Sequence, residues 1–161
     1  LEHDPPQQHP TNTEHWADDA DLLVHVTAFN ALMWNSGRQR TQVIDHTAVI
    51  APEITYGGAS EAGICVINHL LKRGRRLGCD IYLHAQAQVP LALAGMGSTR
   101  LPGGIGEIVN DQLPQLMSQY RYLFHPVRWT SLGLSVIEAM AIGMPIAYAL
   151  LICGVASENS V

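Results

Sequence analysis

Short apolar runs alternate along the chain with segments in which apolar residues recur at helical spacing. The runs predict strands near residues 22–26, 42–46, 63–68, 90–95, 121–126 and 146–152. The segments between them predict helices near residues 27–34, 70–88 and 111–120, and one that begins at Leu134 and ends before Gly143. Strands that alternate with helices are typical of βαβ units. We therefore expect an α/β fold, an incomplete Rossmann-like parallel sheet flanked by helices.

The same pattern predicts how these elements pack. Gly74 and Gly78 weaken the start of the 70–88 helix, so the basic residues there are expected in a loop or a frayed turn. Further along this helix, one face would point inward. The expected inward residues are Leu77, Ile81 and His84 in this helix, and Leu113 and Leu116 in the next one. Residues 98–106 are expected to form a loop. The strand at 146–152 is expected to be buried on both faces of the sheet.

Composition narrows the class of protein. The chain has 161 residues, 47% of them hydrophobic and 14% charged, which fits one globular domain with a core. Its net charge of −5 argues against general nucleic-acid binding. The three scattered cysteines predict reduced thiols in a cytosolic setting. Residues 139–156 carry no charge, but Gly143 and Pro145 interrupt them, so we expect a helix, a turn and a strand, and no transmembrane segment.

The stretch from Thr130 to Ile146 holds the first candidate site. Ser131 and Gly133 form a loop of small residues directly before a helix. The free N–H groups and the dipole of a helix N-terminus can hold an anion. Glu138 lies about one turn inside the helix and would offer an acceptor at the same mouth.

This stretch resembles the C-terminal signature of nucleotide-sugar glycosyltransferases of family 4 (group 1), which have the GT-B fold. It matches at Gly133, Leu134, Glu138, Ala139, Met140, Ala141, Gly143 and Pro145. Thr130, Ser131 and Leu132 depart from the family pattern, and Thr130 stands where the family has a glutamate that contacts the donor sugar. The resemblance implies that Glu138 contacts the nucleotide ribose, and that Thr130, Ser131, Leu132, Gly133 and Leu134 line the donor pocket.

A basic run follows the strand expected at 63–68. It contains Lys72, Arg73, Arg75 and Arg76, four of the nine basic residues of the chain. Ligands of open α/β sheets bind beyond the carboxyl ends of the strands, and guanidinium groups pair well with phosphate. The resemblance implies that basic groups here hold the donor diphosphate and offset its leaving-group charge, a catalytic role that we assign to Arg73 and Arg76. The alternative is a solvated basic helix face.

Two further candidates lie on later loops. Gly95 and Gly97 look like the start of a dinucleotide fingerprint, but no third glycine follows on schedule, which makes a dehydrogenase a weak interpretation. The resemblance implies a Gly-x-Gly loop near the nucleotide, so both glycines stay donor-site candidates. Arg128, after the strand at 121–126, can reach a phosphate or the base, or serve structure alone.

The resemblance also implies a domain organisation and a function. Residues 1–40 would be a remnant of the N-terminal, acceptor-side domain with its linker, and residues 41–161 a truncated nucleotide-sugar-binding domain. The intact enzyme would transfer a hexosyl group from a UDP- or GDP-sugar to an acceptor hydroxyl with retention, without a metal or other cofactor. It would be cytoplasmic or peripheral to a membrane.

A second interpretation stays open. The chain would then be a non-catalytic or degenerate Rossmann-like module for nucleotide binding or interaction. In either case, apolar surface left by missing parts predicts self-association.

Overall fold

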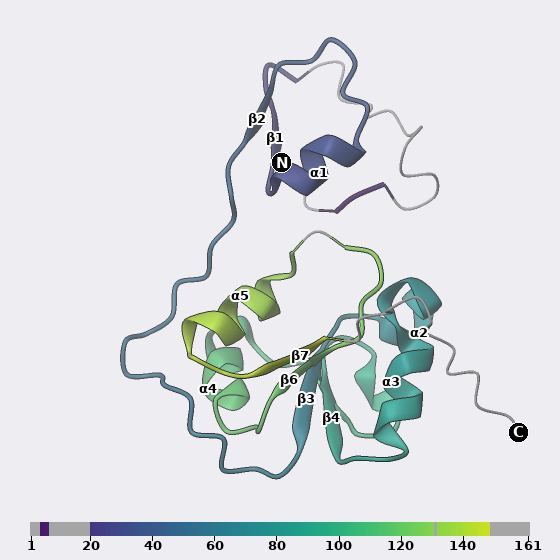
Figure 1. The fold of residues 1–161 in the computed structure, drawn as a ribbon, viewed down its shortest axis with the longest axis vertical. Helices are drawn as coiled ribbons and strands as arrows, with labels where there is room; N and C mark the ends of the chain where they lie inside the picture. Colours follow the sequence, from purple (N-terminus) through teal and green to yellow (C-terminus); the bar gives the residue numbers. More distant parts are fainter. Residues whose placement is uncertain (1–3, 7–19, 131, 149–161) are drawn as a thin grey trace, which may run out of the picture.

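The computed structural model describes residues 4–6, 20–130 and 132–148, which form a small N-terminal unit and a larger sheet domain (Figure 1). The unit consists of β1 (Leu23–His25), α1 (Ala28–Met33) and β2 (Thr41–Val43), with β1 and β2 parallel. The Thr27 hydroxyl accepts a hydrogen bond from the Asn30 N–H and caps α1. Because β2 pairs with β1, the unit extends one short strand past the boundary expected between residues 40 and 41.

The larger domain is built on a five-stranded parallel sheet in the order β5-β4-β3-β6-β7. The strands are β3 (Gly63–Val66), β4 (Leu91–Ala94), β5 (Gly104–Gly106), β6 (Leu123–His125) and β7 (Ile146–Tyr148). The chain starts at the central β3, builds two strands on one side, and then returns to build two on the other. This arrangement confirms the Rossmann-like α/β fold expected from the sequence.

Helices cover both faces of the sheet, with α2 and α3 on one side and α4 and α5 on the other (Figure 1). Successive side chains of β3 serve the two faces in turn. Ile64 packs in the core beneath α4 and α5, while Cys65 packs with Leu70 and Tyr82 on the opposite face. The helices are α2 (Leu70–Arg73), α3 (Cys79–Gln86), α4 (Leu113–Met117) and α5 (Leu134–Ala141), with short 3-10 turns η1 (Gly74–Leu77), η2 (Ser98–Arg100) and η3 (Asn110–Gln112).

The helix expected over 70–88 is broken, and this break corrects its expected inward face. Gly74 and Gly78 both adopt positive φ, which ends α2 and separates the 3-10 turn from α3. The break resets the helical phase, so that Tyr82 is buried and His84 is exposed. Ile81 is half-buried.

Two other expectations also need correction. The loop expected over 98–106 contains the edge strand β5, which its glycines hide from a hydrophobic pattern. Strand β7 is the other edge of the described sheet and is only half-buried, whereas burial on both faces was expected. In α4, Leu113 is buried and Leu116 packs against the same core, as expected, while Met117 is the most buried residue of the helix. Residues 149–152 of the expected last strand lie outside the described residues.

The helices of the described residues are short. The longest, α3 and α5, have eight residues each, whereas a span of the bilayer needs about 20. No helix in the described part of the chain is long and apolar enough to cross a membrane.

Gly78 provides a test of this packing. A Cβ on Gly78 would overlap the carbonyl group of Pro126, and its φ of 76° already disfavours any side chain. We expect Gly78→Ala to lower the free energy of unfolding by about 3 kcal/mol, from the backbone strain together with the clash. Gly143→Ala is the matched control, because Gly143 has nearly the same φ, 77°, but no atom within 4 Å of its Cβ position. It should cost only about 1 kcal/mol in urea unfolding; equal losses would contradict the role of Pro126.

Candidate functional site

A crevice opens beyond the carboxyl ends of β3 and β6, where the chain reverses its direction of strand addition. Open α/β sheets bind their ligands at such a switch point. The crevice has a volume of about 360 Å³, within the usual range of small-molecule sites. Its wall is formed by the ends of these two strands and the start of α5, and includes Asp4, Asn68, Arg73, Asn110, His125, Thr130, Gly133, Leu134, Ser135 and Glu138.

The start of α5 forms one wall of the crevice. Gly133 is the N-cap residue; its carbonyl accepts from the Val136 N–H, so the N–H groups of Leu134 and Ser135 are the ones without an acceptor in the helix. At the other end, Gly143 has a φ of 77°, its N–H donates to the Met140 carbonyl, and the Met144 N–H donates to Ala139. This pair of bonds is a Schellman motif and fixes where the helix ends. The helix therefore runs as the sequence predicts, with its N-terminus at the crevice.

Glu138 is the carboxylate of this wall. Its Oε2 atom is shielded from solvent and has no hydrogen-bond partner among the described residues. Burial raises the pKa of the Glu138 carboxyl above its ordinary value. A shielded acceptor without a donor costs folding free energy. The position therefore suits a ligand that brings hydroxyl donors into the crevice.

The basic run divides into two groups. Arg73 lines the crevice, and Lys72, Arg73 and Arg76 line a neighbouring cavity of about 560 Å³ together with His69 and Asp4, which we call the basic pocket. Burial and the nearby Arg73 lower the pKa of Arg76, although an arginine stays charged at neutral pH. Among the described residues, only Asp4 contributes a carboxylate to this pocket.

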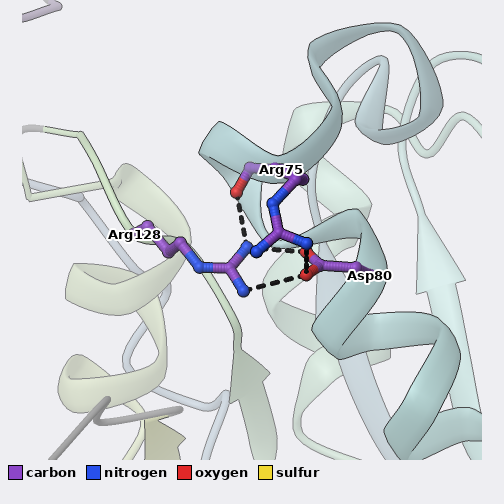
Figure 2. Close-up of polar contacts among 3 residues, drawn as sticks. All are labelled: Arg75, Asp80 and Arg128. Atoms are coloured by element: carbon purple, nitrogen blue, oxygen red, sulfur yellow. Dashed lines mark hydrogen bonds and ion pairs between the residues drawn. The ribbon is translucent and has the colours of Figure 1, made fainter. Parts of the chain in front are cut away.

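Arg75 and Arg128 belong to a separate ion-pair cluster around Asp80 (Figure 2). Arg128 makes two bonds to the Asp80 carboxylate, at 2.6 and 2.9 Å, and donates to the Arg75 carbonyl at 2.7 Å. Arg75 approaches the same carboxylate at 2.7 Å. The hydrogen bond from Arg128 contributes most to holding the pKa of Asp80 near 2. Neither guanidinium lines the crevice, which favours the structural alternative for Arg128.

Gly95 and Gly97 belong to the loop that packs against the segment Ile67–His69, which includes part of the crevice wall. A Cβ on Gly95 would lie 2.6 Å from the Ile67 carbonyl oxygen, so glycine allows the two loops to meet. Between the two glycines, the Met96 N–H donates to Asn68 Oδ1 at 2.9 Å, and the His69 N–H donates to the Met96 carbonyl at 2.8 Å. These bonds hold His69 at a φ of 53°, an uncommon value for a residue other than glycine.

The remaining sequence candidates lie on the loop before α5. Thr130 lines both the crevice and an adjoining apolar groove, and Leu132 lines the groove alone. Ser131 lies outside the described residues.

Sequence reasoning missed several polar residues of the crevice, among them Asp4, Asn68 and Asn110. Asn68 lies two residues past the end of β3, and His125 is the last residue of β6, so position at a strand end is the signal that could have found Asn68. His125 is buried, and burial lowers its pKa to about 4, so its ring is neutral at pH 7. In the described part of the chain, no three metal-binding side chains gather.

Comparisons with known proteins leave the family of this chain open. No model of a protein family matches it, and a search of curated proteins found no match. The fold and the contents of the crevice are therefore the basis for any assignment of function.

The Asp80 cluster predicts a dependence of stability on pH. The folded pKa of Asp80, about 2, lies below its ordinary value of 3.8. Its stabilising effect is therefore fully present above pH 4 and is lost as the pH falls toward 2. We expect the difference in melting temperature between wild type and Asp80→Asn to shrink across this window. Asp111→Asn, at an exposed position outside the cluster, is the control; a constant difference would contradict the assignment.

Glu138 predicts a dependence of stability on pH that is opposite in sign to that of Asp80. Because its folded pKa is raised, protonation favours the folded state, and ionisation above the ordinary pKa of 4.5 costs stability. Glu138→Gln should raise the free energy of unfolding at pH 7 by about 1 kcal/mol. This value is at the low end of the cost of burying a polar atom without a partner, because the residue is only half-buried. The gain should vanish below pH 4 in denaturant titrations. A loss of stability at pH 7 would mean that Glu138 is a structural residue.

Proposed function

We propose that this chain is the donor-binding part of a family 4 glycosyltransferase, which transfers a hexosyl group from a UDP- or GDP-sugar to an acceptor hydroxyl with retention. One observation carries the proposal: Arg73 and Glu138, whose shielded Oε2 has no hydrogen-bond partner among the described residues, line the same crevice at the switch point of the sheet. A nucleoside diphosphate has an anionic part and a ribose with neighbouring hydroxyls. It therefore offers negative charge that Arg73 can bind in place of Asp4, and hydroxyl donors for the Oε2 atom of Glu138.

The basic groups would hold the diphosphate. Arg73 lies in the crevice wall and Arg76 in the adjoining basic pocket, and no carboxylate of the described residues lies within 4.0 Å of Arg76. Guanidinium groups bind phosphate through paired, charge-assisted hydrogen bonds. The first N–H groups of α5 would add donors from the opposite wall. As the bond to the sugar breaks, negative charge grows on the diphosphate, and these positive groups would stabilise it.

Glu138 would bind the ribose. Its carboxylate can accept bonds from two neighbouring hydroxyls, which would satisfy the shielded Oε2 atom. Thr130 would contact the sugar through its hydroxyl. Gly95 and Gly97 would act indirectly, because they support the Asn68–His69 loop of the wall.

A non-catalytic nucleotide-binding module is the second candidate, and Thr130 is the observation that favours it. Thr130 lines the crevice where the resembled family carries a charged glutamate. A hydroxyl can hydrogen-bond to a sugar but supplies no charge to a transition state. Both candidates bind a nucleotide, and only the first transfers the sugar when the intact enzyme is assayed with an acceptor.

Binding measurements test the proposal. The panel contains UDP, GDP, ADP and NAD, and we expect one of the three nucleoside diphosphates to bind in calorimetry. At 100 times its Kd, it should raise the free energy of unfolding by about 2.7 kcal/mol. Arg73→Ala, Arg76→Ala and Glu138→Gln should each weaken it about 10- to 100-fold, the usual effect of losing a hydrogen bond to a charged group.

Arg75→Ala is the matched control for the basic run. Arg75 lies between Arg73 and Arg76 in the sequence but is committed to Asp80, so its loss should change the Kd less than twofold. Absence of any nucleotide binding by the folded chain, or equal losses in Arg75→Ala and Arg73→Ala, would overturn the proposal.

A further inference from the structure

A short N-terminal segment, Asp4–Pro6, lies against the crevice, and we call it the strap. It precedes β1 by many residues, yet Asp4 lines both the crevice and the basic pocket. The strap therefore brings a carboxylate to the cavities in which the positive groups gather.

Two tryptophans from different parts of the fold hold the strap by its backbone. The Trp34 indole N–H, at the end of α1, donates to the Asp4 carbonyl at 2.8 Å. The Trp129 indole N–H, on the loop between β6 and α5, donates to the Pro6 carbonyl at 2.8 Å. Pro5 and Pro6 are fully buried, and since proline has no N–H, they bury no backbone donor. The position of the strap is thus fixed by specific contacts.

The side chain of Asp4 makes an ion pair within reach of solvent. Its Oδ2 lies 3.6 Å from Arg73 Nη2, and the two side chains are 44% and 29% exposed. Ion pairs of this kind are weak and sensitive to salt. Asp4 therefore neutralises Arg73 in part, and a ligand with more negative charge can displace it.

We propose that the strap is a built-in competitor for the anionic part of the ligand: Asp4 occupies Arg73 until a diphosphate replaces it. The identity of that diphosphate as a nucleotide rests on the proposed function. The competition itself needs only the basic pocket and the Asp4–Arg73 pair. Displacement of Asp4 would also strain the hydrogen bonds of the two indoles, so ligand binding and release of the strap are coupled.

Two variants weaken the strap in different ways. Asp4→Asn removes the competing charge and leaves the backbone carbonyl that Trp34 binds. Trp129→Phe removes the hydrogen bond to Pro6 and leaves an aromatic ring near Phe29, its neighbour at 5.3 Å between ring centroids. Asp45→Asn is the matched control, since Asp45 is exposed, carries the same charge and lines neither cavity.

The test is calorimetry of the full chain with inorganic pyrophosphate, a probe that has the diphosphate charge but no base or ribose. Asp4→Asn should bind pyrophosphate about two- to fivefold more tightly than wild type, the range expected for an exposed ion pair. Trp129→Phe should shift affinity in the same direction, and Asp45→Asn should match wild type. The gain of Asp4→Asn should shrink at high salt.

Indole fluorescence gives a second readout. In a Trp16→Phe background, emission comes from Trp34 and Trp129, the two residues that hold the strap. Saturating pyrophosphate should change that emission in wild type and change it less in Asp4→Asn, where the strap is already loosened.

The outcomes separate this inference from the proposed function. Equal pyrophosphate affinities in wild type and Asp4→Asn, or no binding to either, would overturn the proposal that the strap competes with the ligand. Failure of the proposed function looks different: Asp4→Asn binds pyrophosphate more tightly, but no nucleoside diphosphate binds better than pyrophosphate and Glu138→Gln has no effect.

Discussion

The crevice depends on one strand, β3, because β3 pairs with β4 on one side and with β6 on the other. The approach of its neighbours requires Gly63 at its start, since a Cβ there would lie 2.6 Å from the Tyr122 ring. The Gly63 N–H donates to the Pro90 carbonyl, and the Ile64 N–H to the Tyr122 carbonyl. These bonds align the carboxyl ends of the three strands. Asn68 and His125 reach the same opening only because of that alignment.

The site carries local costs that the core must offset. His69 has a strained backbone; among the described residues, the shielded Oε2 of Glu138 has no hydrogen-bond partner and Arg76 has no carboxylate within 4.0 Å. Such features persist where the surrounding packing determines them, and they are typical of binding sites. Here the apolar clusters on the two faces of the sheet supply the packing. In the Asp80 cluster, by contrast, every charge has a partner. That cluster therefore serves the structure, whereas the groups of the crevice are those that we propose for ligand binding.

Local pattern was enough to predict the alternation of strands and helices, the Rossmann-like class, and the limits of α5. These depend on apolar spacing and on glycines that end helices, both of which are readable along the chain. The phase of α3 was missed because a positive-φ glycine, Gly78, resets it without changing the composition. The pairing of Arg128 with Asp80 was also missed, since it joins residues far apart in sequence. Within the run at 72–76, the sequence could not show that Arg75 pairs with Asp80 while Lys72, Arg73 and Arg76 line the basic pocket, because Asp80 meets the run only in the fold.

The cluster around Asp80 has a consequence for how a ligand enters. It joins the two walls of the crevice, because Arg75 and Asp80 belong to the segment after β3, and Arg128 to the loop after β6. The Arg128 and Trp129 N–H groups add backbone bonds to the Arg76 carbonyl across the same seam. These bonds hold the two walls together, and the walls cannot separate without breaking several bonds at once. The N-terminal unit, by contrast, connects to the sheet domain through the long stretch between β2 and β3 (Figure 1). With the two walls joined in this way, a ligand of the proposed kind would reach the crevice along its boundary with the N-terminal unit.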